Sequence, residues 1–171
     1  MLKKFLPNQQ VKSVLEIRPE QLKEKGIKGI ITDLDNTLVE WDRPMATPAI
    51  INWFAEMKKN EIQITIVSNN NENRVKIFSE PLQIPFISKA RKPLKRAFYE
   101  ALKEMSLQKT EIVVIGDQLF TDILGGNRGG FYTVLVIPVV QTDGLITRFN
   151  RILERRVLKW FHKKGLLKWE E

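Results

Sequence analysis

The sequence has 171 residues, 43% of them hydrophobic and 28% charged, which is the composition of one soluble globular domain spanning residues 1–171. It contains no cysteine and a single histidine, His162, so disulfide frameworks, thiolate zinc sites and cysteine nucleophiles are excluded and a Ser-His-Asp triad is disfavoured. The formal net charge of +8 suggests a polyanionic partner, which would be a nucleic acid, an anionic membrane surface or a phosphorylated substrate.

The start of the chain and its apolar runs bear on localisation. The basic segment Met1–Pro7 is followed by polar residues 8–10 rather than by an apolar core, so it is not typical of a signal peptide. The longest apolar stretches, such as 133–140, are too short to span a bilayer, which predicts no transmembrane segment. We expect a cytoplasmic protein, with peripheral contact at the inner face of the membrane as an additional option.

Short apolar runs alternate with helical patterns along most of the chain. Five of these runs predict buried strands: Lys28–Leu34, Ile62–Ser68, Pro85–Ser88, Glu111–Gly116 and Tyr132–Ile137. Most are rich in β-branched residues and lack strict alternation, which is typical of parallel strands covered on both faces. Helices are expected between them, at about Thr47–Asn60, Asn70–Ser79, Pro93–Met105 and Asp122–Asn127. This order predicts an α/β fold with a Rossmann-like, doubly wound parallel sheet of about five strands, its core at about residues 26–140.

A last amphipathic helix is predicted at about residues 145–163, outside this alternation. Its expected apolar face consists of Leu145, Ile146, Phe149, Ile152, Leu153, Val157, Trp160 and Phe161. Its expected basic stripe consists of Arg148, Arg151, Arg155, Lys159 and Lys163. Such a helix either lies in an anionic membrane interface or packs its apolar face on the sheet or on a second subunit, and the two roles can coexist.

Two carboxylates, Asp33 and Asp35, stand where the first predicted strand becomes a loop. In a doubly wound sheet, ligands bind at the carboxyl ends of the strands. An isolated Asp-x-Asp is most often a turn or a helix cap. A calcium loop is excluded because Leu38 and Pro44 occupy its glycine and glutamate positions.

Further polar residues follow the other predicted strands. The second strand ends in Ser68-Asn69-Asn70, Lys92 precedes the third long helix, and the fourth strand ends in Gly116-Asp117 with Asp122 five residues later. Each group alone is explained by a turn, a solvated charge or a helix cap. Together, at one edge of one sheet, they supply the hydroxyl, amine and carboxylates that phosphoryl transfer requires.

This ordered set resembles the four motifs of the haloacid dehalogenase-like phosphatases. The resemblance rests on Asp33-x-Asp35-x-Thr37, Ser68, Lys92 and Gly116-Asp117-x4-Asp122, and it covers roughly Lys28–Val136. It implies a magnesium-dependent phosphomonoesterase that works through an aspartyl-phosphate intermediate.

The resemblance also implies a role for each matched residue. Asp33 is the expected nucleophile, Asp35 the acid and then the base, and Lys92 the group that keeps Asp33 ionised and offsets transition-state charge. The implied Mg²⁺ ligands are the carboxylates of Asp33 and Asp117 and the main-chain carbonyl of Asp35, with Asp122 as a further ligand or the neighbour of one. The residues implied to bind phosphoryl oxygens are Asn36, Thr37, Ser68 and Asn69, and Thr37 is also expected to orient Asp35.

The spacing of the motifs leaves no room for a cap domain. Residues 38–67 hold one flap, one helix and one strand, and residues 71–91 hold one helix and one short strand. An open site suits a substrate that is large or is presented by a membrane. The capless arrangement, the basic start and the basic tail resemble the bacterial and mitochondrial phosphatidylglycerophosphate phosphatases, which implies an anionic lipid phosphate monoester as substrate.

Two other interpretations remain open at this point. The same residues would serve a soluble phosphatase acting on a nucleotide, a sugar or a protein phosphate. The net charge alone would also fit a nucleic-acid-associated scaffold that retains the fold, although no RNA-binding platform or nucleic-acid motif accompanies it, so nucleic acid is not the expected partner.

Overall fold

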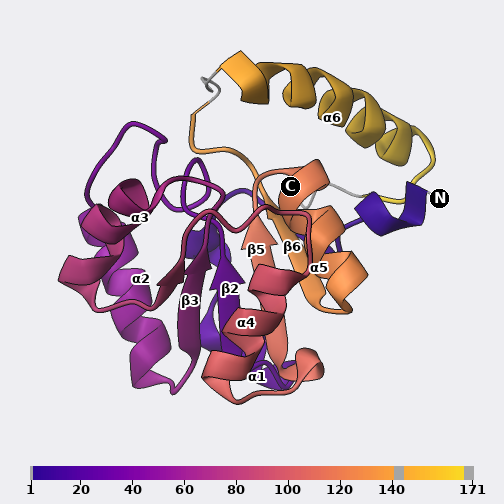
Figure 1. Ribbon diagram of the computed structural model, residues 1–171. Coiled ribbons are helices and arrows are strands. Elements are labelled where there is room, and N and C mark those ends of the chain that lie inside the picture. The colour runs from indigo at the N-terminus through magenta and orange to yellow at the C-terminus, as the bar shows by residue number, and fades with distance from the viewer. Residues whose placement is uncertain (1, 141–144, 168–171) are drawn as a thin grey trace.

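A six-stranded parallel sheet forms the centre of the computed structural model, which describes residues 2–140 and 145–167 (Figure 1). Its strands are β1 (Gln9–Val11), β2 (Gly29–Thr32), β3 (Gln63–Val67), β4 (Phe86–Ile87), β5 (Ile112–Gly116) and β6 (Tyr132–Val136). Their order across the sheet is β1-β6-β5-β2-β3-β4, and every neighbouring pair is parallel. The predicted α/β fold with a doubly wound parallel sheet is confirmed.

The helices lie close to their predicted positions, apart from α1, which was not predicted. They are α1 (Pro19–Glu24), α2 (Pro48–Lys59), α3 (Glu72–Ser79), α4 (Arg96–Met105), α5 (Leu124–Gly129) and α6 (Leu145–Lys163). Short turns of 3-10 helix occur at η1 (Leu2–Phe5), η2 (Val14–Glu16), η3 (Glu80–Leu82) and η4 (Lys109–Glu111), and a π-helical turn at η5 (Leu119–Ile123). The start of α2 shows why: the Thr47 hydroxyl accepts the Ile50 N–H at 3.3 Å, and Pro48 fills the first turn.

The central strands are apolar on both faces because each face is covered by helices. Ile30 of β2 points into a core that α1, α2 and α3 close, while the next residue, Ile31, points into a second core closed by α4. Val113 and Val114 of β5 divide between the two cores in the same way. This period of two explains the continuous apolar runs in the sequence, since no side of these strands meets water.

The sheet extends beyond the predicted five strands. Gln9–Val11 forms the edge strand β1 beside β6, with Gln10 opposite Leu135, so the sheet begins before the expected core at residue 26. The segment is too short and too polar to carry a strand pattern, and it is extended because β6 offers it a partner. The short helix α1 was also missed; Pro19 occupies its first turn.

Both intervals in which a cap domain could be inserted belong to the sheet layers. Within the described residues, 38–67 holds a loop, α2 and β3, while 71–91 holds α3, η3 and β4. The capless arrangement predicted from the sequence is therefore confirmed.

Chain order brings the functional motifs together at one point of the sheet. From β2 the chain continues through α2 to the neighbouring β3, whereas α4 carries it back across to β5 on the other side of β2. The carboxyl ends of β2 and β5 therefore meet where the winding reverses. Ligands of open α/β sheets bind in the crevice at such a reversal.

The C-terminal helix α6 has the bounds predicted for it and lies across the end of the molecule toward which the strands point (Figure 1). Val157 and Leu158 pack against residues of η5 and β6, and the Phe161 side chain is only 1% exposed. Packing of this helix on the fold, one of the two expected roles, is confirmed. Among the described residues, no helix combines the length and the apolar character needed to cross a bilayer.

The prediction of which α6 side chains face inward was partly wrong. Ile152 and Trp160, assigned to the apolar face, are 54% and 39% exposed, whereas Glu154 is buried and accepts the Phe120 N–H at 3.1 Å. The docked stripe is the row Glu154, Val157, Leu158 and Phe161, because η5 presents a backbone donor as well as apolar side chains. The side chains of residues 145–151, which include Leu145, Ile146, Arg148, Phe149 and Arg151, lie outside the described part of the chain.

Candidate active site

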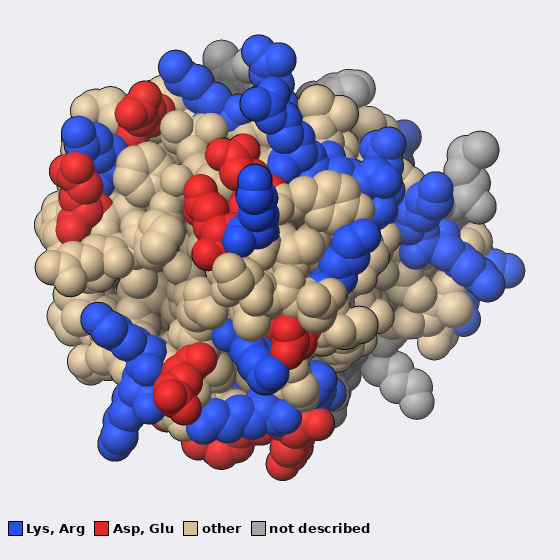
Figure 2. All heavy atoms as spheres, turned by 60° about the horizontal axis from the view of Figure 1, so that its bottom comes forward, with Lys and Arg blue, Asp and Glu red and all other residues tan. Residues whose placement is uncertain are grey.

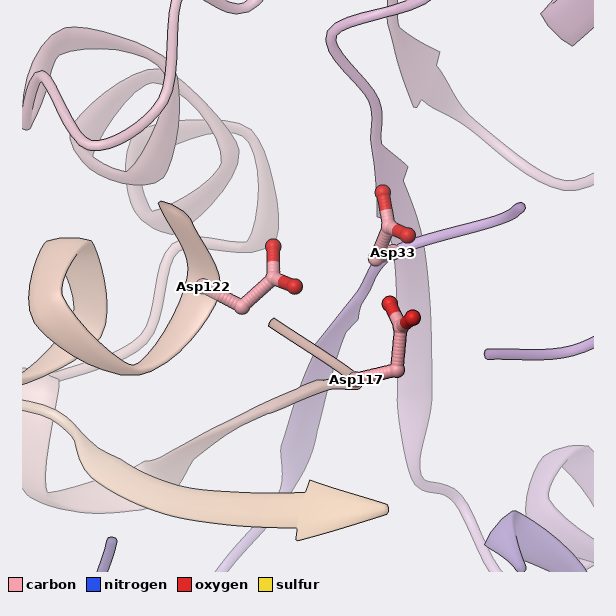
Figure 3. A group of neighbouring side chains, drawn as sticks. All are labelled: Asp33, Asp117 and Asp122. Atoms are coloured by element: carbon pink, nitrogen blue, oxygen red, sulfur yellow. The ribbon is translucent and has the colours of Figure 1, made fainter. Parts of the chain in front are cut away.

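Three carboxylates from adjacent strand ends form one buried cluster. Thr32 of β2 lies opposite Ile115 of β5, and the Asp33 N–H donates to the Ile115 carbonyl at 3.0 Å, so Asp33 and Asp117 leave the sheet side by side. Figure 3 shows Asp33, Asp117 and Asp122 turned toward one another. One oxygen of each lies within 4.8 Å of the others, and all three side chains are buried. We call these three residues the carboxylate cluster.

Asp122 reaches the cluster through the π-helical turn η5. Its carboxylate accepts the Gln118 N–H at 3.1 Å, which caps the start of that turn. A β-carbon added at Gly116 would lie 2.3 Å from the Asp122 Cγ, so only glycine lets this side chain pack over the end of β5. The glycine of Gly116-Asp117-x4-Asp122 is therefore a packing requirement.

Lys92 inserts its ammonium between two members of the cluster. Its Nζ lies 2.6 Å from Asp33 Oδ1 and 2.6 Å from Asp122 Oδ1. Burial alone lowers the pKa of Lys92, but the negative charges of Asp122 and Asp33 outweigh it and raise the pKa above its usual value. Asn69 holds the Lys92 backbone, accepting its N–H at 2.7 Å and donating to its carbonyl at 3.3 Å.

The charge of the site favours a divalent cation. Three carboxylates and one ammonium leave two negative charges in a buried space, and burial raises the pKa of Asp122 to about 6 despite the opposing effect of Lys92. The available donors are carboxylate and carbonyl oxygens, the ligands that hard cations such as Mg²⁺ prefer. The residues present therefore fit a divalent metal.

Thr37 does not orient Asp35 as expected. Its hydroxyl lies 3.0 Å from Asp117 Oδ1 and 3.4 Å from Asp33 Oδ2, so it links the ends of β2 and β5. The expected contact of Thr37 with phosphoryl oxygens stays a prediction.

The other predicted phosphate-binding residues lie at the same edge, with part of their hydrogen-bonding capacity already in use. The Ser68 hydroxyl accepts the Asn70 N–H at 3.1 Å, which leaves its hydrogen able to donate to a phosphoryl oxygen. The Asn69 side chain is engaged by Lys92, and the Asn36 N–H donates to the Val39 carbonyl at 2.7 Å. In this arrangement Asn69 and Asn36 shape the site, and their contact with phosphate stays a prediction.

Two residues hold Asp35: Asn70, expected only as one of the polar residues that end the second predicted strand, and Arg74, which the sequence did not single out. The Asn70 side chain donates to Asp35 Oδ2 at 2.9 Å, and the Arg74 Nε donates to Asp35 Oδ1 at 3.1 Å. Burial, reinforced by the charge of Asp33 and opposed by Asn70 and Arg74, raises the pKa of Asp35 above its usual value. In the sequence, Arg74 stands in the first turn of the helix that follows Asn70. This position does not distinguish it from a solvent-exposed arginine.

Comparisons with known proteins agree with this geometry. Residues 2–141 match the model of a family described as mitochondrial PGP phosphatase. The chain belongs to that family. It is also 64% identical over 172 residues to the probable phosphatase YqeG of Bacillus subtilis, an alignment that covers 100% of both chains.

More distant relatives extend the comparison. The chain is 33% identical over 177 residues to phosphatidylglycerophosphate phosphatase 1, chloroplastic/mitochondrial, of Arabidopsis thaliana, covering 94% of this chain and 49% of that one, about half its length. A haloacid dehalogenase-like hydrolase of Brucella suis shares the fold with a TM-score of 0.51 at 11% identity, covering 75% of this chain and 99% of that one. The predicted haloacid dehalogenase-like fold is confirmed, and the family match confirms the predicted phosphatase.

Proposed function

We propose that this phosphatase hydrolyses phosphomonoesters with Mg²⁺, through a covalent intermediate on Asp33. The observation that carries the proposal is the position of the Asp33 carboxylate, which lies at the winding reversal with the Lys92 ammonium 2.6 Å from one of its oxygens. A phosphate ester repels an anionic nucleophile. Buried positive charge at this place lowers that repulsion.

The proposed reaction has two chemical steps, which use Asp33 and Asp35. In the first, an Asp33 oxygen bonds to phosphorus, the ester P–O bond breaks, and Asp35 gives its proton to the leaving alkoxide. In the second, Asp35 takes a proton from water while the water oxygen bonds to phosphorus. Inorganic phosphate leaves and the Asp33 carboxylate is restored.

The carboxylate cluster would hold the metal. Asp33, Asp117 and the Asp35 carbonyl are the proposed ligands, and Asp122, shared with Lys92, is a further ligand or the neighbour of one. When bound, Mg²⁺ would neutralise phosphoryl oxygens and orient the ester for in-line attack. The ammonium of Lys92, between Asp33 and Asp122, would supply a second positive charge to the site.

The proposed substrate is phosphatidylglycerophosphate, an anionic lipid monoester, with phosphatidylglycerol and phosphate as products. The family match and the similarity to the Arabidopsis phosphatidylglycerophosphate phosphatase support it. The capless fold supports it as well, since no further domain covers the strand ends in the described residues.

The outer side of α6 suits an anionic membrane surface. Ile152, Leu153 and Trp160 are exposed there, and so are Arg155, Arg156, Lys159 and Lys163. Each basic side chain near an anionic leaflet contributes roughly 1 kcal/mol, and exposed apolar residues add insertion into the interface. Basic side chains are also spread around much of the face in Figure 2, with smaller groups of acidic ones, so the excess positive charge is not confined to α6.

The test is phosphate release from a panel of esters: phosphatidylglycerophosphate in mixed micelles, a nucleotide, a sugar phosphate and a phosphopeptide. We expect the lipid ester to have the highest kcat/KM and Asp33→Asn to abolish release from all of them, because an amide is a very poor nucleophile. A rate of phosphate release by Asp33→Asn within about tenfold of the wild-type rate would exclude the mechanism. Such a difference corresponds to only ~1.4 kcal/mol in activation free energy. A soluble ester turned over better than the lipid would exclude the substrate and leave the mechanism standing.

A further inference from the structure

Asp35 is held by a guanidinium that none of the sequence motifs contains. Arg74 approaches Asp35 Oδ1 with two nitrogens, Nε at 3.1 Å and Nη2 at 2.9 Å. The other oxygen, Oδ2, receives the Asn70 side chain at 2.9 Å. Both oxygens of the carboxylate are therefore fixed by separate donors, which determines the plane of the group.

Arg74 is itself fixed from two directions. Its backbone N–H donates to the Asn71 side chain at 2.9 Å, which is the N-cap bond of α3. Its Nη1 reaches the Pro44 carbonyl at 3.4 Å, so the guanidinium also contacts the loop between β2 and α2. One side chain thus connects the start of α3, the Asp35 carboxylate and the loop beside the site.

We propose that Arg74 is a positioning residue that orients Asp35 for proton transfer. The inference rests on the role of Asp35 in the proposed function. Arg74 donates to Oδ1 from Nε and holds its Nη2 2.9 Å from the same oxygen as an ion pair, whereas Oδ2 accepts a neutral N–H from Asn70. The guanidinium charge beside Oδ1 disfavours a proton on that oxygen, so the proton given to the leaving group is carried on Oδ2, and Arg74 fixes the orientation of the carboxyl group.

The contact differs from the other ion pairs at the surface. Arg43–Glu40 and Lys76–Glu80 are solvent-exposed pairs, of a kind that contributes little. The Arg74 and Asp35 side chains are only 14% and 20% exposed. The site's other cation, Lys92, pairs with Asp33 and Asp122. The Lys92 ammonium thus pairs with the proposed nucleophile, Asp33, and the Arg74 guanidinium pairs with the proposed acid and base, Asp35.

Leaving-group dependence tests the proposal. A p-nitrophenolate leaves without much help from an acid, whereas the alkoxide of glycerol 3-phosphate needs the proton of Asp35. We expect Arg74→Ala to lower kcat/KM at least about tenfold on glycerol 3-phosphate and clearly less on p-nitrophenyl phosphate, with Arg74→Lys between Arg74→Ala and wild type. Lys76→Ala, on the same helix and exposed, is the matched control and should leave both values unchanged.

A double-mutant cycle separates this inference from the proposed function. If Arg74 acts through Asp35, Arg74→Ala should have no further effect in the Asp35→Asn background. Equal losses on both esters, or losses that simply multiply in the double variant, would overturn the positioning role while Asp35→Asn still shows that the acid is needed. Full activity of Asp35→Asn would instead remove the acid itself, and the inference with it. Thermal melting checks folding, and should Arg74→Ala not fold, the substrate dependence of Arg74→Lys decides.

Discussion

The carboxylate cluster and the C-terminal helix both gather charge, and the fold treats that charge in opposite ways. The three carboxylates of the cluster are buried, and so is Lys92 beside them. The Lys92 ammonium lies 2.6 Å from Asp33 and 2.6 Å from Asp122. On α6 the basic side chains Arg155, Arg156, Lys159 and Lys163 are exposed, and Glu154 is buried on the docked face.

The energetic cost of a charge depends on its burial, which differs between these two regions. Buried carboxylates are costly unless compensated, so the cluster is a site where metal, ammonium and substrate must be matched in position and number. Exposed basic residues are largely hydrated and screened by salt, so those of α6 act together and at longer range. The first region is suited to chemistry and the second to recruitment to a surface.

The largest expected effect is loss of the metal from the cluster. We expect a chelator to reduce phosphate release at least about a thousandfold and Mg²⁺ to restore it, because two uncompensated negative charges would repel the ester. Asp117→Ala should raise the Mg²⁺ concentration needed for half-maximal activity, whereas the exposed Glu80→Ala should not. Full activity in the presence of chelator would contradict the view that the cluster is a metal site.

Docking of α6 is tested next by Phe161→Ala. The Phe161 side chain is 1% exposed, so truncation should lower the free energy of unfolding by about 3–5 kcal/mol in denaturant titrations. Trp160→Ala, at 39% exposure, is the neighbouring control and should cost much less. Similar small losses for both would mean that α6 is not packed on the fold, and the contrast between its two faces would disappear.

A smaller loss of stability, with a large effect on activity, is expected for Gly116→Ala. The new methyl group would lie 2.3 Å from the Asp122 Cγ and displace that carboxylate, costing about 1–3 kcal/mol of folding stability. Gly126→Ala is the matched control, because its methyl group would lie 2.6 Å from the Thr133 side chain and outside the cluster. Both variants should lose stability, and only Gly116→Ala should lose turnover per folded molecule. Equal turnover in the two would show that Asp122 tolerates displacement.

The smallest effect on the chemistry is expected from the outer side of α6. Replacing Arg155, Arg156, Lys159 and Lys163 with glutamine should weaken binding to anionic vesicles at least about tenfold at low salt and lower turnover of the lipid ester. Turnover of p-nitrophenyl phosphate should be unchanged, since none of these residues touches the cluster. Equal loss on both substrates would assign α6 a purely structural role, and unchanged lipid turnover would remove it from substrate selection.

Local sequence determined the cluster almost completely. Asp33 and Asp117 were predicted because each directly follows an apolar run, and parallel strands bring their carboxyl ends to one edge. Lys92 and Asp122 were predicted by their order relative to those strands. The bounds of α6 followed in the same way from periodicity, because helical spacing is a property of neighbouring residues.

Contacts between distant segments were decided only by tertiary structure. The strand β1 is extended because β6 pairs with it, and the inner face of α6 includes Glu154 because the Phe120 N–H needs an acceptor there. Thr37 contacts Asp117 rather than Asp35, and Arg74 reaches Asp35 only because α3 packs beside the loop after β2. Apolar runs and strand ends are local patterns that a sequence carries by itself, whereas the partner of a polar side chain depends on which segments the folded core brings within about 3 Å of it.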